Sequence, residues 1–171
     1  MSEPLAERMR PQTLDEYVGQ QHLVGEGAVL RRMLESGRIP SFILWGPPGV
    51  GKTTLARIVA RQLKVPFYTL SAVTSGVKEV REVIERAKNS SFFNTTSPIL
   101  FIDEIHRFSK SQQDTLLGAV EHGTVTLIGA TTENPSFEVI RPLLSRCQVY
   151  VLKPLGKQDL QRLLERAITE D

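Results

Sequence analysis

The residues best suited to chemistry lie between Gly46 and Thr54, where the sequence reads GPPGVGKTT. The spacing G-x-x-x-x-G-K-T is that of a P-loop, whose glycines let successive backbone N–H groups point at a phosphate chain. The Lys52 ammonium can reach the terminal phosphates, and the Thr53 hydroxyl can ligate Mg²⁺. The predicted phosphate-binding residues are Gly46, Pro47, Pro48, Gly49, Val50, Gly51, Lys52, Thr53 and Thr54. The alternative is a glycine turn with an incidental lysine.

Two acidic residues follow a second apolar stretch. Asp103 and Glu104 come directly after residues 99–102, which read ILFI. Beside a P-loop, the first carboxylate suits the Mg²⁺ shell, directly or through water, and the second can polarise the water that attacks a γ-phosphate. The 51 residues from Lys52 to Asp103 (103 − 52) leave room for a helix, a strand and a further helix. The alternative is a solvated strand end with ordinary acids.

A polar stretch follows the next predicted strand, at GATTEN. A hydrogen bond from Thr132 could hold the attacking water beside the acid pair, and Asn134 is the second choice. The alternative is that these residues only cap the loop before Pro135. Farther along, Arg146 comes just before another predicted strand, and spacing alone favours a solvated surface arginine there.

Alternating strands and helices are predicted to position these residues. Apolar runs predict strands at 41–45, 66–72, 98–102, 124–131 and 148–152, and helical periodicity predicts helices at 27–36, 52–63, 76–88, 110–121 and 156–169. A capping-box pattern at 13–16 predicts the start of a short helix, and 89–97 reads as a polar loop whose Phe92 and Phe93 are packing groups. This alternation predicts a parallel, doubly wound α/β layer with ligands at the carboxyl ends of its strands.

Composition sets further bounds. The chain has 171 residues, so we expect one domain, with room for the start of a second. Its net charge of +2 gives no overall indication of nucleic-acid binding. Its single cysteine, Cys147, is predicted to be a small core residue and fits a reducing compartment. His22, His106 and His122 show no metal-ligand spacing and are predicted to be structural or surface residues. We expect a cytoplasmic location, because no apolar run approaches the ~18 residues of a membrane span.

Longer phrases carry a resemblance to a known family. They are RMRPQTLDEYVGQQHL, SAVTSGVKEVREVIERA, DEIHRFSKSQQD and GATTENPSFEV, together with GPPGVGKTT and LLSRC. Over essentially its whole length the chain resembles the AAA+ ATPases of the clamp-loader clade. It is most similar to the replication-associated recombination proteins (RarA/MgsA), whose eukaryotic member is the Werner-helicase-interacting protein. The implied fold is α/β, a P-loop AAA+ core with a five-stranded parallel sheet between helices, followed by the start of a helical lid.

The resemblance also implies roles for individual residues. Asp103 and Glu104 match the Walker B pair, and Thr132 matches sensor 1. Arg146 lies in the match to the SRC motif, which implies an arginine finger that acts on a neighbouring subunit. Residues 10–19 match a segment that borders the adenine, so the base-pocket candidates are Tyr17, Val18 and Gly19. The implied catalytic residues are Lys52, Glu104, Thr132 and Arg146, and the implied metal ligands are Thr53 and Asp103.

The activity implied is that of an ATPase that uses ATP and Mg²⁺. It would couple ATP binding and hydrolysis to remodelling of DNA or DNA-bound proteins at stalled replication forks. The implied partners are single-stranded, gapped or forked DNA, bound through the full-length oligomer, and single-strand-binding protein. A homo-oligomer is implied for the full-length protein, and no membrane is implied. The implied location is the bacterial cytoplasm, with nucleoid association. Two alternatives remain open: a P-loop kinase or nucleotide transferase, and an ATP-binding switch or assembly subunit with little hydrolysis.

Family members are longer than this chain, which sets the expected domain boundaries. Residues 1–154 are expected to form the ATPase core with its N-terminal arm. Residues 155–171 are expected to be the first helix of a truncated lid, which would make the chain an N-terminal fragment.

Overall fold

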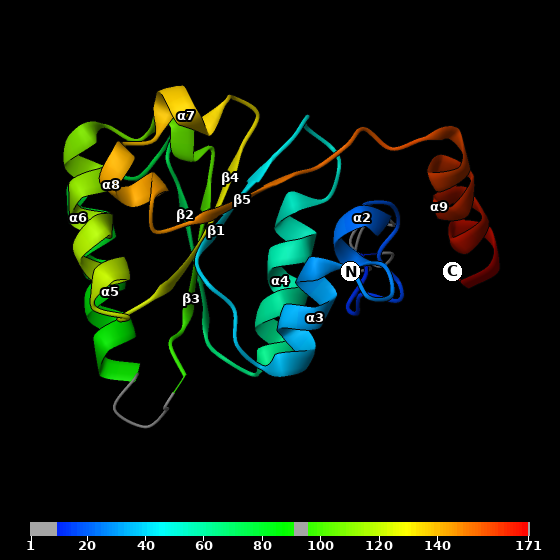
Figure 1. Ribbon diagram of the computed structural model, residues 1–171, viewed down its shortest axis with the longest axis horizontal. Helices are drawn as coiled ribbons and strands as arrows, with labels where there is room; N and C mark the ends of the chain where they lie inside the picture. The colour runs from blue at the N-terminus through cyan, green and yellow to red at the C-terminus, as the bar shows by residue number, and fades with distance from the viewer. Residues whose placement is uncertain (1–9, 91–95, 171) are drawn as a thin grey trace, which may run out of the picture.

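The centre of the molecule is a parallel sheet, and the computed structural model describes residues 10–90 and 96–170 around it (Figure 1). The strands are β1 (Phe42–Trp45), β2 (Phe67–Ser71), β3 (Ile99–Asp103), β4 (Thr126–Thr131) and β5 (Gln148–Val151). The helices are α2 (Gln21–Val24), α3 (Val29–Ser36), α4 (Lys52–Leu63), α5 (Val77–Ser90), the 3₁₀ helix η1 (Ile105–Arg107), α6 (Lys110–Glu121), α7 (Pro135–Glu138), α8 (Arg141–Leu144) and α9 (Lys157–Glu170). The five strands run parallel in the order β2-β3-β4-β1-β5, so the predicted α/β fold is confirmed.

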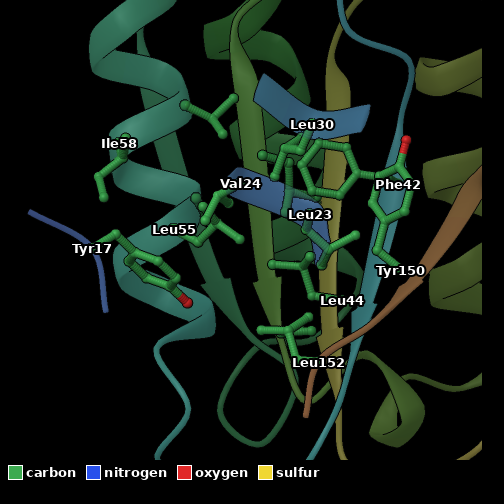
Figure 2. Close-up of a cluster of buried hydrophobic side chains, with 14 of the residues drawn as sticks. Tyr17, Leu23, Val24, Leu30, Phe42, Leu44, Leu55, Ile58, Tyr150 and Leu152 are labelled. Carbon is green, nitrogen blue, oxygen red and sulfur yellow. The ribbon is translucent and has the colours of Figure 1, made fainter. Parts of the chain in front are cut away.

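Helices cover both faces of the sheet, with α3 and α4 on one side and α5 and α6 on the other (Figure 1). Successive strand residues point to opposite faces, so Phe42 and Leu44 join the apolar cluster under α3 and α4, while Ile43 joins the cluster under α5 and α6. Figure 2 shows the first cluster, in which α2, α3 and α4 pack on the sheet. Double-sided burial explains why the central strands β1, β3 and β4 are mostly apolar, whereas the edge strands β2 and β5 are more exposed.

The helix boundaries follow from local chemistry. In α6 the Ser109 side chain accepts a hydrogen bond from the Gln112 backbone N–H, and the Gln112 side chain accepts one from Ser109 N–H. This reciprocal pair satisfies two N–H groups that a helix start would otherwise leave without partners. The C-terminal end of α3 is set by Gly37, which adopts a left-handed φ of 77° that glycine tolerates without a steric cost.

The N-terminal segment is joined to the connection between β5 and α9. The Gln20 side-chain amide donates to the Lys153 carbonyl (2.7 Å) and its oxygen accepts from the Lys153 N–H (2.8 Å). The Arg166 guanidinium pairs with the Glu16 carboxylate at 2.6 Å. These contacts place α9 beside the start of the chain, as Figure 1 shows on the side of the molecule that carries α2.

The structure departs from the sequence-based expectations mainly in short elements. The predicted helix start at Thr13 is wrong: residues 14–16 form only a turn, closed by hydrogen bonds from Glu16 N–H to Thr13 O and from Tyr17 N–H to Leu14 O. The short helices α2, η1, α7 and α8 were not predicted, because three or four residues carry no periodicity. Residues 1–9 of the arm, and Phe92 and Phe93 of the predicted loop, lie outside the described residues.

Within residues 10–90 and 96–170, no helix is both long and apolar enough to cross a membrane.

Candidate active site

A cavity of about 850 Å³ opens at the carboxyl ends of the central strands. Its position is set by topology, because β1 leads through α4 to the far edge of the sheet while the chain later returns to place β4 and β5 on either side of β1. Ligands of open α/β sheets bind at such switch points. The lining residues are Arg10, Pro11, Pro48, Gly49, Gly51, Lys52, Thr53, Thr54, Asp103, Glu104, Thr131, Thr132, Leu163 and Ala167.

The loop between β1 and α4 has the backbone geometry of a phosphate cradle. Gly49 and Gly51 both adopt left-handed φ values, 78° and 92°, and α4 begins at Lys52 directly after Gly51. The loop therefore directs its N–H groups and the positive end of the α4 dipole into the cavity, where they favour an anion. Gly46 lets the chain pass close to β5, since a Cβ there would lie 2.8 Å from the Leu152 carbonyl oxygen.

The Lys52 ammonium is held within the same loop. Its Nζ donates to the carbonyl oxygens of Gly46 (2.6 Å) and Pro47 (3.2 Å). Burial lowers the pKa of Lys52, while the nearby carboxylates of Asp103 and Glu104 act in the opposite direction. The positive charge of Lys52 and the negative charges of Asp103 and Glu104 therefore interact across the cavity. Lys52 and Asp103 are 51 positions apart in the sequence (103 − 52).

The two acids project from the carboxyl end of β3. Asp103 is the last residue of the strand, and its pairing partner is Ser71 of β2. Glu104 adopts a left-handed conformation with φ 54° and ψ 47°, uncommon for a residue with a side chain. Its carboxylate lies 3.5 Å from the Arg107 guanidinium, one turn along η1.

The end of β4 supplies two threonines. Thr131 is only 2% exposed, and its Oγ1 accepts a hydrogen bond from the Glu133 N–H (2.9 Å) and lies 2.8 Å from His106 Nδ1. Thr132, the predicted water-positioning residue, is exposed and lines the cavity beside the acid pair. Asn134 caps α7 instead, because its side-chain oxygen accepts from Ser136 N–H. Thr131 was missed in the sequence, where two adjacent threonines offer no sign of which one is buried.

The three candidates for the adenine pocket lie behind the P-loop. Tyr17 is buried, and its hydroxyl lies 3.0 Å from the carbonyl oxygens of both Val50 and Gly51. Gly19 approaches the β5–α9 connection, since a Cβ there would lie 2.8 Å from Leu155 Cδ2. Tyr17 supports the P-loop from behind, and none of Tyr17, Val18 and Gly19 is among the residues that line the cavity, so their role beside a base stays a prediction.

Sequence reasoning also missed lining residues on both sides of the cavity mouth. Among the described residues, the arm contributes Arg10 and Pro11, and α9 contributes Leu163 and Ala167. The apolar pair on α9 is spaced four residues apart and so shares one helix face. The periodicity of α9 predicted an apolar helix face, but nothing in the sequence alone indicated which face of α9 lies beside the cavity.

Arg146 lies away from this cavity. It precedes β5, whose first residue Gln148 pairs with Phe42 at the start of β1, whereas the P-loop follows the end of β1. The Arg146 side chain is 54% exposed and lies 3.8 Å from the Glu121 carboxylate. The sheet thus separates Arg146 from the phosphate cradle of its own chain.

The oxygen donors in the cavity fit a magnesium ion better than a softer metal. Thr53 at the start of α4 and Asp103 at the end of β3 both line it. Mg²⁺ is usually held by one or two protein oxygens together with substrate phosphates and water. A hydroxyl and a carboxylate beside a phosphate cradle match that donor set.

Comparison with family models decides the class of protein. Residues 42–155 match the model of the ATPase family associated with various cellular activities (AAA). The chain belongs to the AAA family. The match covers β1 through β5 and therefore includes the P-loop, the acid pair and the threonines of β4.

Curated relatives match almost the entire chain. The replication-associated recombination protein A of Escherichia coli strain K12 is 54% identical over 168 residues, and that of Haemophilus influenzae is 53% identical over 167. Each alignment covers 98% of this AAA chain and 37% of the relative. ATPase WRNIP1 of Dictyostelium discoideum is 51% identical over 96% of the chain and 19% of that protein. This AAA chain thus spans little more than a third of the bacterial relatives' length.

Solved structures show the same architecture. The RuvB Holliday junction branch migration motor of Thermotoga maritima superimposes with a TM-score of 0.77 at 30% identity. The superposition covers 95% of this AAA chain and 54% of RuvB, so the similarity extends beyond the sheet to the flanking helices.

Proposed function

We propose that this chain is a Mg²⁺-dependent ATPase domain that couples ATP binding and hydrolysis to the remodelling of DNA or DNA-bound proteins at stalled replication forks. The observation that carries the proposal is that the P-loop, Asp103, Glu104 and Thr132 line the same cavity. The similarity to the replication-associated recombination proteins supports the setting.

The P-loop residues bind and orient the phosphates. The N–H groups of residues 49–54 and the Lys52 ammonium meet the negative charge of the β- and γ-phosphates, and Lys52 exchanges its bonds to the loop carbonyls for this contact. Thr53 and, directly or through water, Asp103 would hold a magnesium ion. When bound, Mg²⁺ neutralises charge that develops on the phosphate oxygens.

The acid pair and β4 handle the attacking water. Glu104 accepts a proton from the water as the water oxygen bonds to the γ-phosphorus, and Thr132 holds that water by a hydrogen bond. The bond from the γ-phosphorus to the bridging oxygen breaks, and ADP and inorganic phosphate leave. A kinase or nucleotide transferase would instead need an acceptor hydroxyl in place of the water. A carboxylate base serves either reaction, and the match to the AAA ATPase family is what favours hydrolysis over transfer.

Arg146 completes the site of a neighbouring copy. Its place at the opposite end of the sheet from its own P-loop prevents action in its own chain. A guanidinium offered to a neighbour's γ-phosphate stabilises the charge of the transition state. The proposal therefore includes a homo-oligomer with the nucleotide between subunits. Its partners are single-stranded, gapped or forked DNA and single-strand-binding protein, met in the bacterial cytoplasm near the nucleoid.

The deciding experiment is the Glu104→Gln variant. The amide keeps the shape of the side chain but cannot take the proton, so ATP should still bind while turnover falls at least about 100-fold. Glu82→Gln, the same change on the exposed face of α5, is the matched control and should leave turnover as it is. Phosphate release measured with single-stranded DNA present and absent gives the rate. Undiminished turnover by Glu104→Gln would disprove the assignment.

The trans role of Arg146 has a separate signature. Turnover per chain should rise with protein concentration, because the site is complete only between copies. Arg146→Ala should remove that rise and leave ATP affinity nearly unchanged, whereas Arg141→Ala on the exposed start of α8 should keep it. A concentration-independent rate in the unsubstituted protein would contradict the arginine-finger role.

A further inference from the structure

The backbone at Glu104 needs support from its surroundings. Its left-handed conformation (φ 54°, ψ 47°) is unfavourable for any residue with a Cβ, and such a conformation persists only where neighbouring contacts hold it. The contact that reaches the carboxylate itself is an exposed ion pair with Arg107, and exposed pairs contribute little rigidity. Strand β3 holds the residue before Glu104, and η1 holds the residues after it through the bond from Arg107 N–H to the Glu104 carbonyl oxygen (2.9 Å).

The helix η1 is docked on β4 by two contacts. Ile105 is fully buried and packs over Gly129, where a Cβ would lie only 3.1 Å from Ile105 Cδ1. His106, half-buried, places Nδ1 2.8 Å from Thr131 Oγ1. The first contact is apolar and tolerates sliding, whereas the hydrogen bond fixes both distance and direction.

Thr131 relays this position to Thr132. The Thr131 Oγ1 that lies beside His106 also accepts a hydrogen bond from the Glu133 N–H at 2.9 Å. Thr132 lies between Thr131 and Glu133, so this hydrogen bond spans it. Thr131 is 2% exposed, which shields these hydrogen bonds from water. A chain of contacts therefore runs from Glu104 through His106 and Thr131 to the backbone of Thr132.

We propose that His106 is a positioning residue that sets the separation between Glu104 and Thr132, the two groups that hold the attacking water. The inference rests on the proposed hydrolysis of ATP. Among the described residues, His106 is not one of those that line the cavity. It belongs to η1, which follows Glu104 directly, and so acts on Glu104 through the backbone. Misplacement of a reacting group by about 1 Å can cost 100-fold in rate, so the bond between His106 and Thr131 should govern turnover and not ATP binding.

The test uses substitutions of His106 that place a polar atom either where its ring nitrogen Nδ1 lies or where Nε2 lies. His106→Asn supplies an oxygen or nitrogen where Nδ1 lies and should restore the bond to Thr131. His106→Gln supplies its polar atoms where Nε2 lies and should not. We expect kcat to fall about 10- to 100-fold in His106→Ala and His106→Gln, with His106→Asn within about threefold of the unsubstituted protein and ATP affinity changed less than about twofold throughout.

The partner hydroxyl supplies an independent test. Thr131→Val removes it while keeping the shape, and Thr131→Ser retains it. If His106 acts through Thr131, His106→Ala should reduce kcat strongly in the Thr131 background and little further in the Thr131→Val background. Thr131→Ser should keep most of the rate. The measurements are made on the complete protein, with ATP affinity determined separately from turnover.

Each outcome separates the inference from the proposed function. No turnover by the unsubstituted protein, or full turnover by Glu104→Gln, overturns the proposed hydrolytic site and this inference with it. An inactive Glu104→Gln beside a fully active His106→Ala overturns the positioning role alone. Equal rates in His106→Asn and His106→Gln, or additive effects of His106→Ala and Thr131→Val, show that His106 acts by packing and also overturn it.

Discussion

A methyl group added at Gly51 should damage the P-loop far more than one added at Gly49. Both glycines have left-handed φ values, so alanine at either position costs about 1–2 kcal/mol of backbone strain. The two differ in their surroundings. A Cβ on Gly49 meets nothing within 4 Å, whereas a Cβ on Gly51 would lie 2.8 Å from Tyr17 Oη and 3.1 Å from its Cε2.

The magnitude follows from these contacts. Tyr17 is 5% exposed and its hydroxyl bonds to the Val50 and Gly51 carbonyls, so the ring has little room to retreat. Overpacking of this kind costs about 1–3 kcal/mol. We therefore expect Gly51→Ala to lower the free energy of unfolding by about 2–5 kcal/mol in total, and Gly49→Ala by about 1–2 kcal/mol.

The assay is urea unfolding at equilibrium, with nucleotide affinity measured in parallel. Tyr17→Phe serves as the second arm, because it removes the oxygen that the new methyl group would meet first. By itself it should cost about 1 kcal/mol for the lost hydrogen bond. Gly51→Ala should then be less costly in the Tyr17→Phe background, by about 1 kcal/mol.

Two results would refute this reasoning. Equal losses for Gly49→Ala and Gly51→Ala would mean that only backbone strain matters and that Tyr17 yields freely. An undiminished cost of Gly51→Ala in the Tyr17→Phe background would mean that the clash lies with some other group.

Three further predictions concern the side chains of Cys147, Tyr17 and Gln20. Burial raises the pKa of the Cys147 thiol to about 12, so iodoacetamide at pH 8 should label it slowly, and mass spectrometry showing labelling as fast as in urea would contradict this. Burial also raises the pKa of Tyr17 above its usual 10.0. Above pH 10 the unfolded phenol therefore loses a proton that the folded one keeps, and the free energy of unfolding should fall by about 1.4 kcal/mol per pH unit, with a smaller contribution from Tyr150, whose pKa burial also raises. Urea unfolding at pH 9–11 checks this, and a slope unchanged in Tyr17→Phe would oppose it. Gln20→Ala, which removes both hydrogen bonds to the Lys153 backbone, should lower the free energy of unfolding by about 1–3 kcal/mol, and a urea-measured loss below about 0.5 kcal/mol would contradict that value.

The sequence predicted the long elements of the fold well. The helices Lys52–Leu63 and Lys110–Glu121 were predicted with the bounds that the structure has, because each has a clear start signal and more than three turns of periodicity. Lys52, Asp103 and Thr132 meet in one cavity as expected, since the carboxyl ends of parallel strands share one edge of the sheet.

What the sequence left open depends on contacts between distant segments. The Thr13–Glu16 pattern satisfies a capping box locally, yet the chain turns there instead, with Leu14 and Tyr17 buried in the core. The relation between His106 and Thr131 is likewise invisible in a linear reading, because it depends on how η1 lies against β4. Burial in tertiary structure decided both cases, and local patterns do not encode it.

The contacts that join Gln20 to Lys153 have a consequence for how the protein is made. The two residues are 133 positions apart. At a synthesis rate of about 5–20 residues per second, Lys153 is therefore made roughly 7–27 s after Gln20. Sheet strands β1 to β4 are all synthesised within that interval. Gln20 is therefore made well before the residue that fastens it, and newly made chains pass through a period in which the P-loop exists but Gln20 is not yet joined to Lys153.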